Sequence, residues 1–148
     1  MSQVRRLSIA LVNDRCEIPR LAEIAARFGA AHDLSDDDVM NIQLVLDELV
    51  INVIRHGFED IGDTNRHEID VRLSLDPDDI LTIEIEDDAR AYDPRNAPEP
   101  QFDLPIEQRR VGGLGVHIVK ALMDTFDYRR ENDRNIVTLT KQVQRLSP

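Results

Sequence analysis

Tryptophan is absent from this 148-residue sequence, aromatic residues make up only 4% of it, and Cys16 is the single cysteine. One cysteine excludes a framework of disulfide bonds, and four scattered histidines without paired cysteines exclude a zinc finger. No apolar run reaches the roughly 18 residues that a membrane-spanning helix needs. Residues 1–10 also lack the apolar centre of a signal peptide. We therefore expect a cytoplasmic protein without a membrane partner.

Basic residues are scarce as well. Eighteen lysines and arginines stand against 29 aspartates and glutamates, which gives a formal net charge of −11. A surface of this charge repels nucleic acids and anionic lipids, so we expect no direct nucleic-acid partner. Any polyanionic ligand must therefore be held by backbone amides, a metal ion and a few well-placed cations.

Two periodicities in the sequence predict its secondary structure. Alternating apolar and polar residues indicate strands, and apolar residues three and four positions apart indicate helices. The expected strands lie at residues 7–11, 69–75, 81–85, 126–130 and 136–143, and the expected helices at 19–29, 35–57 and 116–123. Ser35 can cap the second helix, and Gly57 is expected to end it.

The order of these elements predicts an α+β fold in a single domain, residues 1–148. Consecutive antiparallel strands and helices imply a two-layer α/β sandwich, in which helices cover one face of a mixed, mostly antiparallel sheet. A doubly wound fold is excluded because parallel strands separated by helices are lacking. Residues 93–111 show no periodicity and hold four of the seven prolines, which predicts a long loop that is functional or disordered.

Three clusters of residues could carry chemistry, and each also has an ordinary structural explanation. Glu48 and Asn52 are adjacent on a helix, where a carboxylate can orient a nucleophile and an amide oxygen can bind Mg²⁺. The alternative is two solvated polar side chains at a helix edge. Residues 86–94 (EDDARAYDP) lie at the end of a strand, where an aspartate can accept a hydrogen bond from an exocyclic amine, or the charged strand end can simply enter a turn. Residues 112–115 (GGLG) open a helix whose amides can hold an anion, although such turns often carry no ligand.

The order and spacing of these clusters resemble the histidine kinase-like ATPase superfamily, whose members have the Bergerat ATP-binding fold. The matching stretches are residues 46–57 (LDELVINVIRHG), 92–94 (YDP), 112–124 (GGLGVHIVKALMD) and 135–139 (NIVTL). Within that superfamily, the sequence is most similar to the stand-alone anti-sigma factor serine/threonine kinases of bacterial partner-switching systems. The resemblance covers essentially the whole chain and makes residues 93–112 the expected ATP lid.

The resemblance implies a role for each matching residue. Glu48 would be the general base or orienting carboxylate, Asn52 the Mg²⁺ ligand, and Asp87 the acceptor for the adenine amine. Thr138 would support Asp87, and the glycine-rich turn would let lid and helix amides close over the phosphates. The other implied ATP-binding residues are His56, Ala91, Gly113, Leu114, Gly115 and Val116.

The function implied by the resemblance is that of a switch kinase dependent on ATP and Mg²⁺. Such a protein would bind a sigma factor or another regulatory target. It would phosphorylate serine or threonine on a small antagonist domain of the anti-anti-sigma type, and it would form a homodimer.

One departure from the family pattern keeps other functions open. After the aspartate, the family pattern reads Asp-x-Gly-x-Gly or Asp-x-Gly-x-Pro. In this sequence Ala89 and Ala91 stand at the positions of the glycine and of the glycine or proline. If position 89 requires a positive φ, alanine costs about 1–2 kcal/mol, which lowers ATP affinity about tenfold. If the backbone there is ordinary, alanine only adds a methyl group near the adenine. The alternatives are therefore a nucleotide-gated protein-binding module with little or no kinase activity, and a scaffold that binds no nucleotide.

Overall fold

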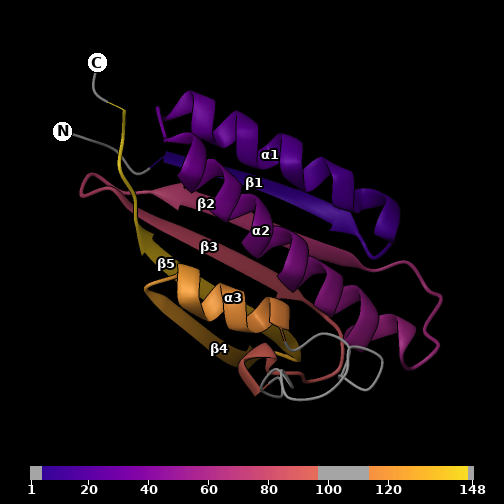
Figure 1. Ribbon diagram of the computed structural model, residues 1–148. Helices are drawn as coiled ribbons and strands as arrows, with labels where there is room; N and C mark the ends of the chain where they lie inside the picture. The colour runs from indigo at the N-terminus through magenta and orange to yellow at the C-terminus, as the bar shows by residue number, and fades with distance from the viewer. Residues whose placement is uncertain (1–4, 97–113, 147–148) are drawn as a thin grey trace, which may run out of the picture.

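The computed structural model describes residues 5–96 and 114–146, which form a five-stranded sheet and three α-helices (Figure 1). The strands are β1 (Arg5–Val12), β2 (Glu68–Leu75), β3 (Ile80–Asp87), β4 (Thr125–Glu131) and β5 (Arg134–Gln142), and the helices are α1 (Ile18–Ala31), α2 (Asp36–Asn52) and α3 (Leu114–Leu122). Short 3-10 helices cover Arg15–Glu17 and Pro94–Asn96, and a π-helix covers Val53–Glu59. The order of strands and helices expected from the sequence is confirmed.

The sheet has the strand order β1-β2-β3-β5-β4, and each neighbouring pair is antiparallel. No parallel pair occurs among the described strands, so the sheet is antiparallel and not mixed. The three helices lie on one face of it (Figure 1), which confirms the two-layer α+β architecture. Because β3 and β5 are neighbours, Asp87 and Asn135 lie directly opposite each other although 48 positions separate them in the sequence.

The hydrophobic core lies between the helices and the sheet. The inward side chains of β2 and β3 alternate with polar ones, and Val71 and Ile83 are fully buried. Leu46 and Leu49 of α2 belong to the same buried cluster. Half-buried strands with this alternation present one apolar face to the helices and one polar face to solvent.

The opposite face of the sheet carries a network of ion pairs across three strands. Arg72 on β2 pairs with Glu84 and Glu86 on β3. Arg134 on β5 pairs with Glu86 and, at 3.3 Å, with Asp70 on β2. These charges neutralise one another on the face of the sheet that the helices do not cover.

Helix α2 begins where the sequence predicts, but it does not end at the predicted residue. The Oγ atom of Ser35 accepts a hydrogen bond from the backbone N–H of Asp38 at 3.1 Å, which confirms the expected cap. The expected end at Gly57 is wrong, because the chain continues from Asn52 as the π-helix Val53–Glu59. The N–H of Asp60 donates to the carbonyl of Arg55 at 2.8 Å, five residues earlier, which is the hydrogen bond of a π turn.

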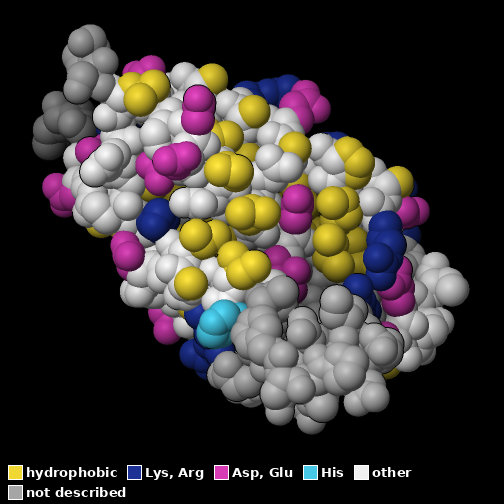
Figure 2. Space-filling model, viewed as in Figure 1, with side chains coloured by type: hydrophobic (Ala, Val, Ile, Leu, Met, Phe, Trp, Pro, Cys, Tyr) yellow, Lys and Arg dark blue, Asp and Glu magenta, His cyan; other side chains and the backbone are white. Residues whose placement is uncertain are grey.

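The helical face exposes apolar side chains among acidic ones (Figure 2). Met40 and Leu44 of α2 are 54% and 47% exposed, and Ile118 of α3 is also exposed. Helix α2 contains no lysine or arginine. None of the helices among the described residues combines the length and the apolar character that crossing a membrane requires.

His67 ties the connection before β2 to the segment after β3. Its Nε2 atom lies 2.9 Å from Oδ2 of Asp63, and its Nδ1 atom lies 3.0 Å from Oδ1 of Asp88. Its ring stacks on Phe58 with the ring centroids 4.6 Å apart. Burial works to lower the pKa of His67, but the hydrogen bonds and charges of Asp88 and Asp63 outweigh it. The pKa is therefore raised above its usual value.

We expect the free energy of unfolding to fall as the pH rises above about 6.5, the unfolded pKa of histidine, and His67→Gln to remove most of this fall. Because the pKa of His67 is higher in the folded chain, its contribution is complete below the unfolded value of about 6.5 and is lost as the pH rises through the folded value. Urea unfolding at several pH values measures the effect.

His32 supplies the matched control. Burial lowers its pKa, so His32 contributes with the opposite sign, and the fall should persist in His32→Gln. A fall of the same size in His67→Gln as in the unchanged protein would contradict the prediction.

Candidate functional site

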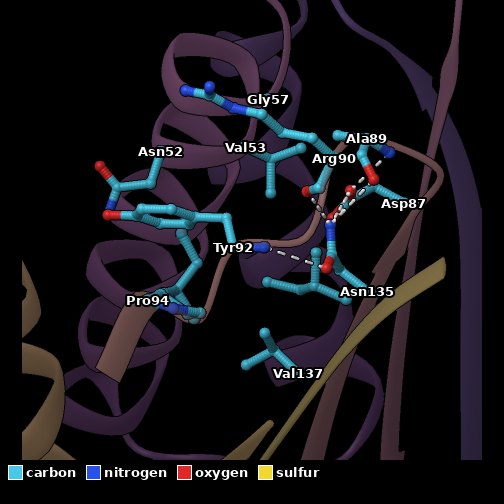
Figure 3. Close-up of a pocket in the computed structure, with 12 residues that line it drawn as sticks. Asn52, Val53, Gly57, Asp87, Ala89, Arg90, Tyr92, Pro94, Asn135 and Val137 are labelled. Carbon is cyan, nitrogen blue, oxygen red and sulfur yellow. Dashed lines mark hydrogen bonds between the residues drawn. The ribbon is translucent and has the colours of Figure 1, made fainter. Parts of the chain in front are cut away.

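A cavity of about 380 Å³, part of it open to solvent, lies between the end of α2 and the ends of β3 and β5 (Figure 3). It is lined by Leu49, Asn52, Val53 and Gly57 from the helical side, by Ile85, Asp87, Ala89, Arg90, Tyr92 and Pro94 from β3 and the segment after it, and by Asn135 and Val137 from β5. Most of its lining is apolar. Asn52 stands at one side, and Asp87 and Asn135 stand at the other (Figure 3). Apolar walls with a few placed polar groups are typical of small-molecule sites.

Asp87 provides a buried hydrogen-bond acceptor at one end of the cavity. It is only 3% exposed, and its Oδ1 atom accepts hydrogen bonds from the N–H of Ala89 at 3.0 Å and from Nδ2 of Asn135 at 2.9 Å. Within the described part of the chain, no donor contacts its Oδ2 atom. Burial raises the pKa of Asp87, against the lowering effect of its two hydrogen bonds. The second oxygen is therefore available to an amino group of a ligand.

The expected support of Asp87 by Thr138 is wrong, and Asn135 takes that place. Asp87 is directly opposite Asn135 in the β3–β5 register, whereas Thr138 is opposite Glu84 on the other face of the sheet. The reason is the two-residue period of a strand, because positions three apart point to opposite faces. The sequence analysis begins this strand at residue 136, whereas β5 begins at Arg134, and Asn135 was therefore missed.

Glu48 and Asn52 lie together on α2, as their spacing predicts, and of the two only Asn52 lines the cavity. Nδ2 of Asn52 donates to Oε1 of Glu48 at 3.2 Å, and Asn52 is 4% exposed. This bond leaves the Oδ1 atom of Asn52 as its available oxygen.

One amide oxygen fits a magnesium ion that is bound mainly by phosphates and water. Among the described residues, no group of three or more histidine, cysteine, aspartate or glutamate side chains could form a metal cage. The donor set around Asn52 therefore suits Mg²⁺ that arrives with a phosphate ligand.

The start of α3 contacts Glu48. A methyl group added to Gly115 would overlap the carboxylate of Glu48, so the missing side chain makes room for this carboxylate. Leu114 begins the helix, and Val116 is buried and does not line the cavity. Gly113 and residues 97–112 of the expected lid lie outside the described residues.

His56 and Ala91 do not line the cavity, although both were expected to bind ATP. The ring of His56 stacks on that of Tyr92, with centroids 4.8 Å apart, and its Nδ1 atom lies 2.9 Å from Oδ2 of Asp60. Tyr92 itself lines the cavity, as Asn52 does (Figure 3). His56 therefore packs behind Tyr92, which separates it from the cavity. The sequence analysis assigned no role to Tyr92, although it lies in the matching stretch 92–94.

Ala89 fits the site without backbone strain. Among the described residues other than glycine, a positive φ occurs at Asp33, Asp79, Asn132 and Asp133, so Ala89 and Ala91 have ordinary backbones. A Cβ atom on Gly57 would lie 2.7 Å from the Cβ atom of Ala89. The methyl group of Ala89 thus occupies space that the bare backbone of the π-helix leaves free, and the strained alternative does not apply.

We expect Gly57→Ala to destabilise the protein by about 1–3 kcal/mol, the usual cost of overpacking a close contact. Ala89→Gly should restore most of this stability, because it removes the other methyl group of the pair. Thermal and urea unfolding of the two single variants and the double variant measure the coupling.

A matched control is Ala91→Gly, which changes the next alanine of the same segment but does not face Gly57. Its effect should add to that of Gly57→Ala without rescue. Equal rescue by both substitutions would show that backbone freedom, and not the contact, limits stability.

Several characterised proteins are similar to this chain. The serine/threonine-protein kinase BtrW of Bordetella bronchiseptica is 28% identical over 100 residues, which are 67% of each chain. The anti-sigma F factor of a Thermoanaerobacter species is 25% identical over 122 residues, 81% of each chain. The serine-protein kinase RsbW of Listeria monocytogenes is 27% identical over 128 residues, 83% of this chain and 75% of RsbW. The chain is therefore a distant relative of anti-sigma factors and serine kinases.

Solved structures share the fold. The RsbU and RsbW domains of a Mycobacterium tuberculosis protein superpose with a TM-score of 0.67 at 18% identity, over 95% of this chain and 32% of that chain. The histidine kinase domain of a blue-light-activated kinase from Erythrobacter litoralis has a TM-score of 0.53 at 16% identity, over 85% of this chain and 64% of that one. This chain thus spans about a third of the first of these longer chains and just under two thirds of the second.

The sequence pattern of the histidine kinase-like ATPase domain matches residues 12–141. The match extends from the end of β1 into β5 and includes every residue that lines the cavity. The chain therefore belongs to the histidine kinase-like ATPase domain family.

Proposed function

We propose that this chain is an ATP-dependent protein serine/threonine kinase that also acts as a binding switch. One observation carries the proposal. The cavity has a buried acceptor, Asp87, at one end and Asn52 at the other, and Asn52 is hydrogen-bonded to Glu48 one helical turn earlier. A nucleoside triphosphate has complementary ends, a base with an amino group and a chain of phosphates.

At the base end, Oδ2 of Asp87 would accept a hydrogen bond from the amine of adenine, and Ala89 and Val137, which line the cavity, would contact the ring. An acceptor held by two other hydrogen bonds is already oriented, so little freedom is lost on binding. Membership of the histidine kinase-like ATPase family supports ATP binding. What we propose is that Oδ2 of Asp87 is the atom that binds the adenine amine.

At the phosphate end, the first backbone amides of α3 would face the phosphates. A helix N-terminus offers free N–H groups and the positive end of the helix dipole. This arrangement suits a chain with a net charge of −11, because it needs no cluster of basic side chains.

Glu48 would act on the hydroxyl of the substrate serine. The serine oxygen forms a bond to the γ-phosphorus, the bond between that phosphorus and the β–γ bridging oxygen breaks, and ADP leaves. The hydroxyl proton passes to the carboxylate of Glu48. A carboxylate in this role contributes about 10²- to 10⁴-fold to a rate.

Mg²⁺, held by Oδ1 of Asn52 and the phosphates, would neutralise charge on the phosphates when bound. The hydrogen bond between Asn52 and Glu48 then serves both groups, since it points the amide oxygen away from the carboxylate. The chain supplies position and charge, which is most of what phosphoryl transfer requires.

The name of the anti-sigma F factor supports a sigma factor as a partner, and the family resemblance implies the other partners. A sigma factor or another regulator would be the sequestered target, a small antagonist domain would be the substrate, and a second copy would complete a homodimer. Exposed Met40 and Leu44 lie on the same helix as Glu48 at four-residue spacing, which supports a protein substrate over a small one.

Co-purification from the native cell, followed by mapping of phosphorylated residues on the proteins that accompany the chain, tests the proposal. The expected result is a small protein phosphorylated on serine or threonine. A single-turnover reaction of both purified proteins with Mg²⁺ and ATP should then transfer one phosphate.

A stable complex that depends on ATP but forms no phosphoprotein would instead establish a nucleotide-gated binding module. Absence of fluorescent ATP binding at millimolar concentration would establish a scaffold. Either result contradicts the kinase proposal.

A further inference from the structure

The side chain of Asn135 makes six hydrogen bonds among the described residues, and four of them go to Asp87 and the segment after it, at the base end. It is 4% exposed and comes from β5, whereas most of its partners belong to β3 or to the segment after it. Sequence motifs of the site gave it no role.

The nitrogen of the Asn135 amide holds Asp87 and the backbone after it. Nδ2 donates to Oδ1 of Asp87 and to the carbonyl of Arg90, both at 2.9 Å, with the carbonyl of Ala89 at 3.4 Å. These bonds orient the carboxylate and the segment that forms the cavity wall (Figure 3).

The oxygen of the same amide accepts from three donors. They are the hydroxyl of Tyr128 at 2.6 Å, Nη1 of Arg130 at 3.1 Å and the N–H of Tyr92 at 3.3 Å. Because donors surround Oδ1 and acceptors surround Nδ2, exchanging the two atoms would break these hydrogen bonds, and the amide has one favourable orientation. Nδ2 is therefore directed at Asp87.

Donation from Asn135 also favours the ionised form of Asp87, against the effect of burial. An ionised carboxylate can only accept hydrogen bonds. It therefore pairs with a 6-amino group and not with a 6-oxo group of a purine.

We propose that Asn135 is a positioning residue that makes this site select adenine over 6-oxopurines, acting through Asp87. The inference rests on the proposed binding of ATP and deepens it. Asn135 does not need to touch the base, because its amide fixes which oxygen of Asp87 faces the cavity and keeps it an acceptor.

The test compares the dissociation constants of ATP and inosine triphosphate, which differ at the 6-position in an amino or an oxo group. Calorimetry of the unchanged protein with Mg²⁺ should show ATP binding at least about tenfold tighter, since sites built to bind a donor reject analogues that lack it. Asn135→Asp keeps the size but replaces the donor with a second carboxylate. Two carboxylates this close must share a proton, so they no longer offer a pure acceptor.

In Asn135→Asp, the preference for ATP should fall at least about tenfold and should vary with pH, because the shared proton titrates. The affinity for inosine triphosphate should stay equal or rise. Asn135→Ala should lower the preference without the pH dependence, and it keeps the test valid if the aspartate variant does not fold. Asn132→Asp, the same substitution in the exposed β4–β5 turn, is the matched control and should keep the preference.

The outcomes separate the two proposals. If the unchanged protein binds neither nucleotide, the proposed function fails. If it binds both equally, or if the Asn135 variants weaken both nucleotides by the same factor, ATP binding stands and the selecting role of Asn135 is overturned.

Discussion

Glu48→Gln should lower the rate of serine phosphorylation at least about 100-fold while ATP affinity changes less than about threefold. Glutamine keeps the size of the side chain and an oxygen that accepts from Nδ2 of Asn52. It cannot take up a proton, so the contribution of the general base, about 10²- to 10⁴-fold, is lost. Single-turnover phosphate transfer and fluorescent ATP binding, measured on the same preparation, separate the two effects.

Asp47→Asn is the matched control for this experiment. Asp47 is the adjacent acidic residue on α2 and is half-buried, but the hydrogen bond from Asn52 and the contact with Gly115 are made by Glu48. Its replacement should leave the transfer rate within about twofold. A Glu48→Gln variant that retains the full rate would remove Glu48 from the chemistry, whatever its effect on binding.

Gly115→Ala should also lower the transfer rate about 100-fold, and for a different reason. The added methyl group overlaps the carboxylate of Glu48, which is the flexible end of its side chain and can move aside. The fold should survive, because alanine is the better helix former by up to about 1 kcal/mol. A catalytic group displaced by about 1 Å can lose about 10²-fold in rate. Single-turnover kinetics and thermal unfolding measure the two properties.

The double variant Glu48→Gln, Gly115→Ala tests this explanation. If the glycine acts by positioning Glu48, the second substitution should add little to the first, since both affect one interaction. Ala121→Gly changes helix propensity at an exposed position of α3 and should leave the rate unchanged. A fully multiplicative loss in the double variant would mean that Gly115 acts on the phosphates and not on Glu48.

Most of the fold could be predicted because each strand and helix buries one face and exposes the other, which leaves a periodic pattern of apolar residues in the sequence. Their apolar residues recur with periods of two and 3.6, and these periods depend only on local backbone geometry. The same period places Glu48 beside Asn52, four positions apart on α2, and this is the part of the site that sequence reasoning identified directly. The family resemblance supplied Asp87.

What could not be predicted depends on contacts between distant segments. The space beside Ala89 is set by Gly57, 32 positions earlier, and no local pattern pairs the two. The π-helix has no signal in composition, and Gly57 resembles an ordinary helix stop. Thr138 was chosen by similarity to a family position, although the strand period directs it to the face opposite Asp87.

The π-helix allows the side chains at one end of the cavity to change among related chains while those at the other end stay in place. A π turn holds roughly one residue more than an α turn, so loss of one residue from Val53–Glu59 would restore ordinary winding. Every later side chain of the segment would then rotate by about 100°. Gly57 would leave Ala89, while Glu48 and Asn52, which precede the change, would keep their register. A single-codon deletion could thus reshape the wall around the purine without disturbing the chemistry of transfer.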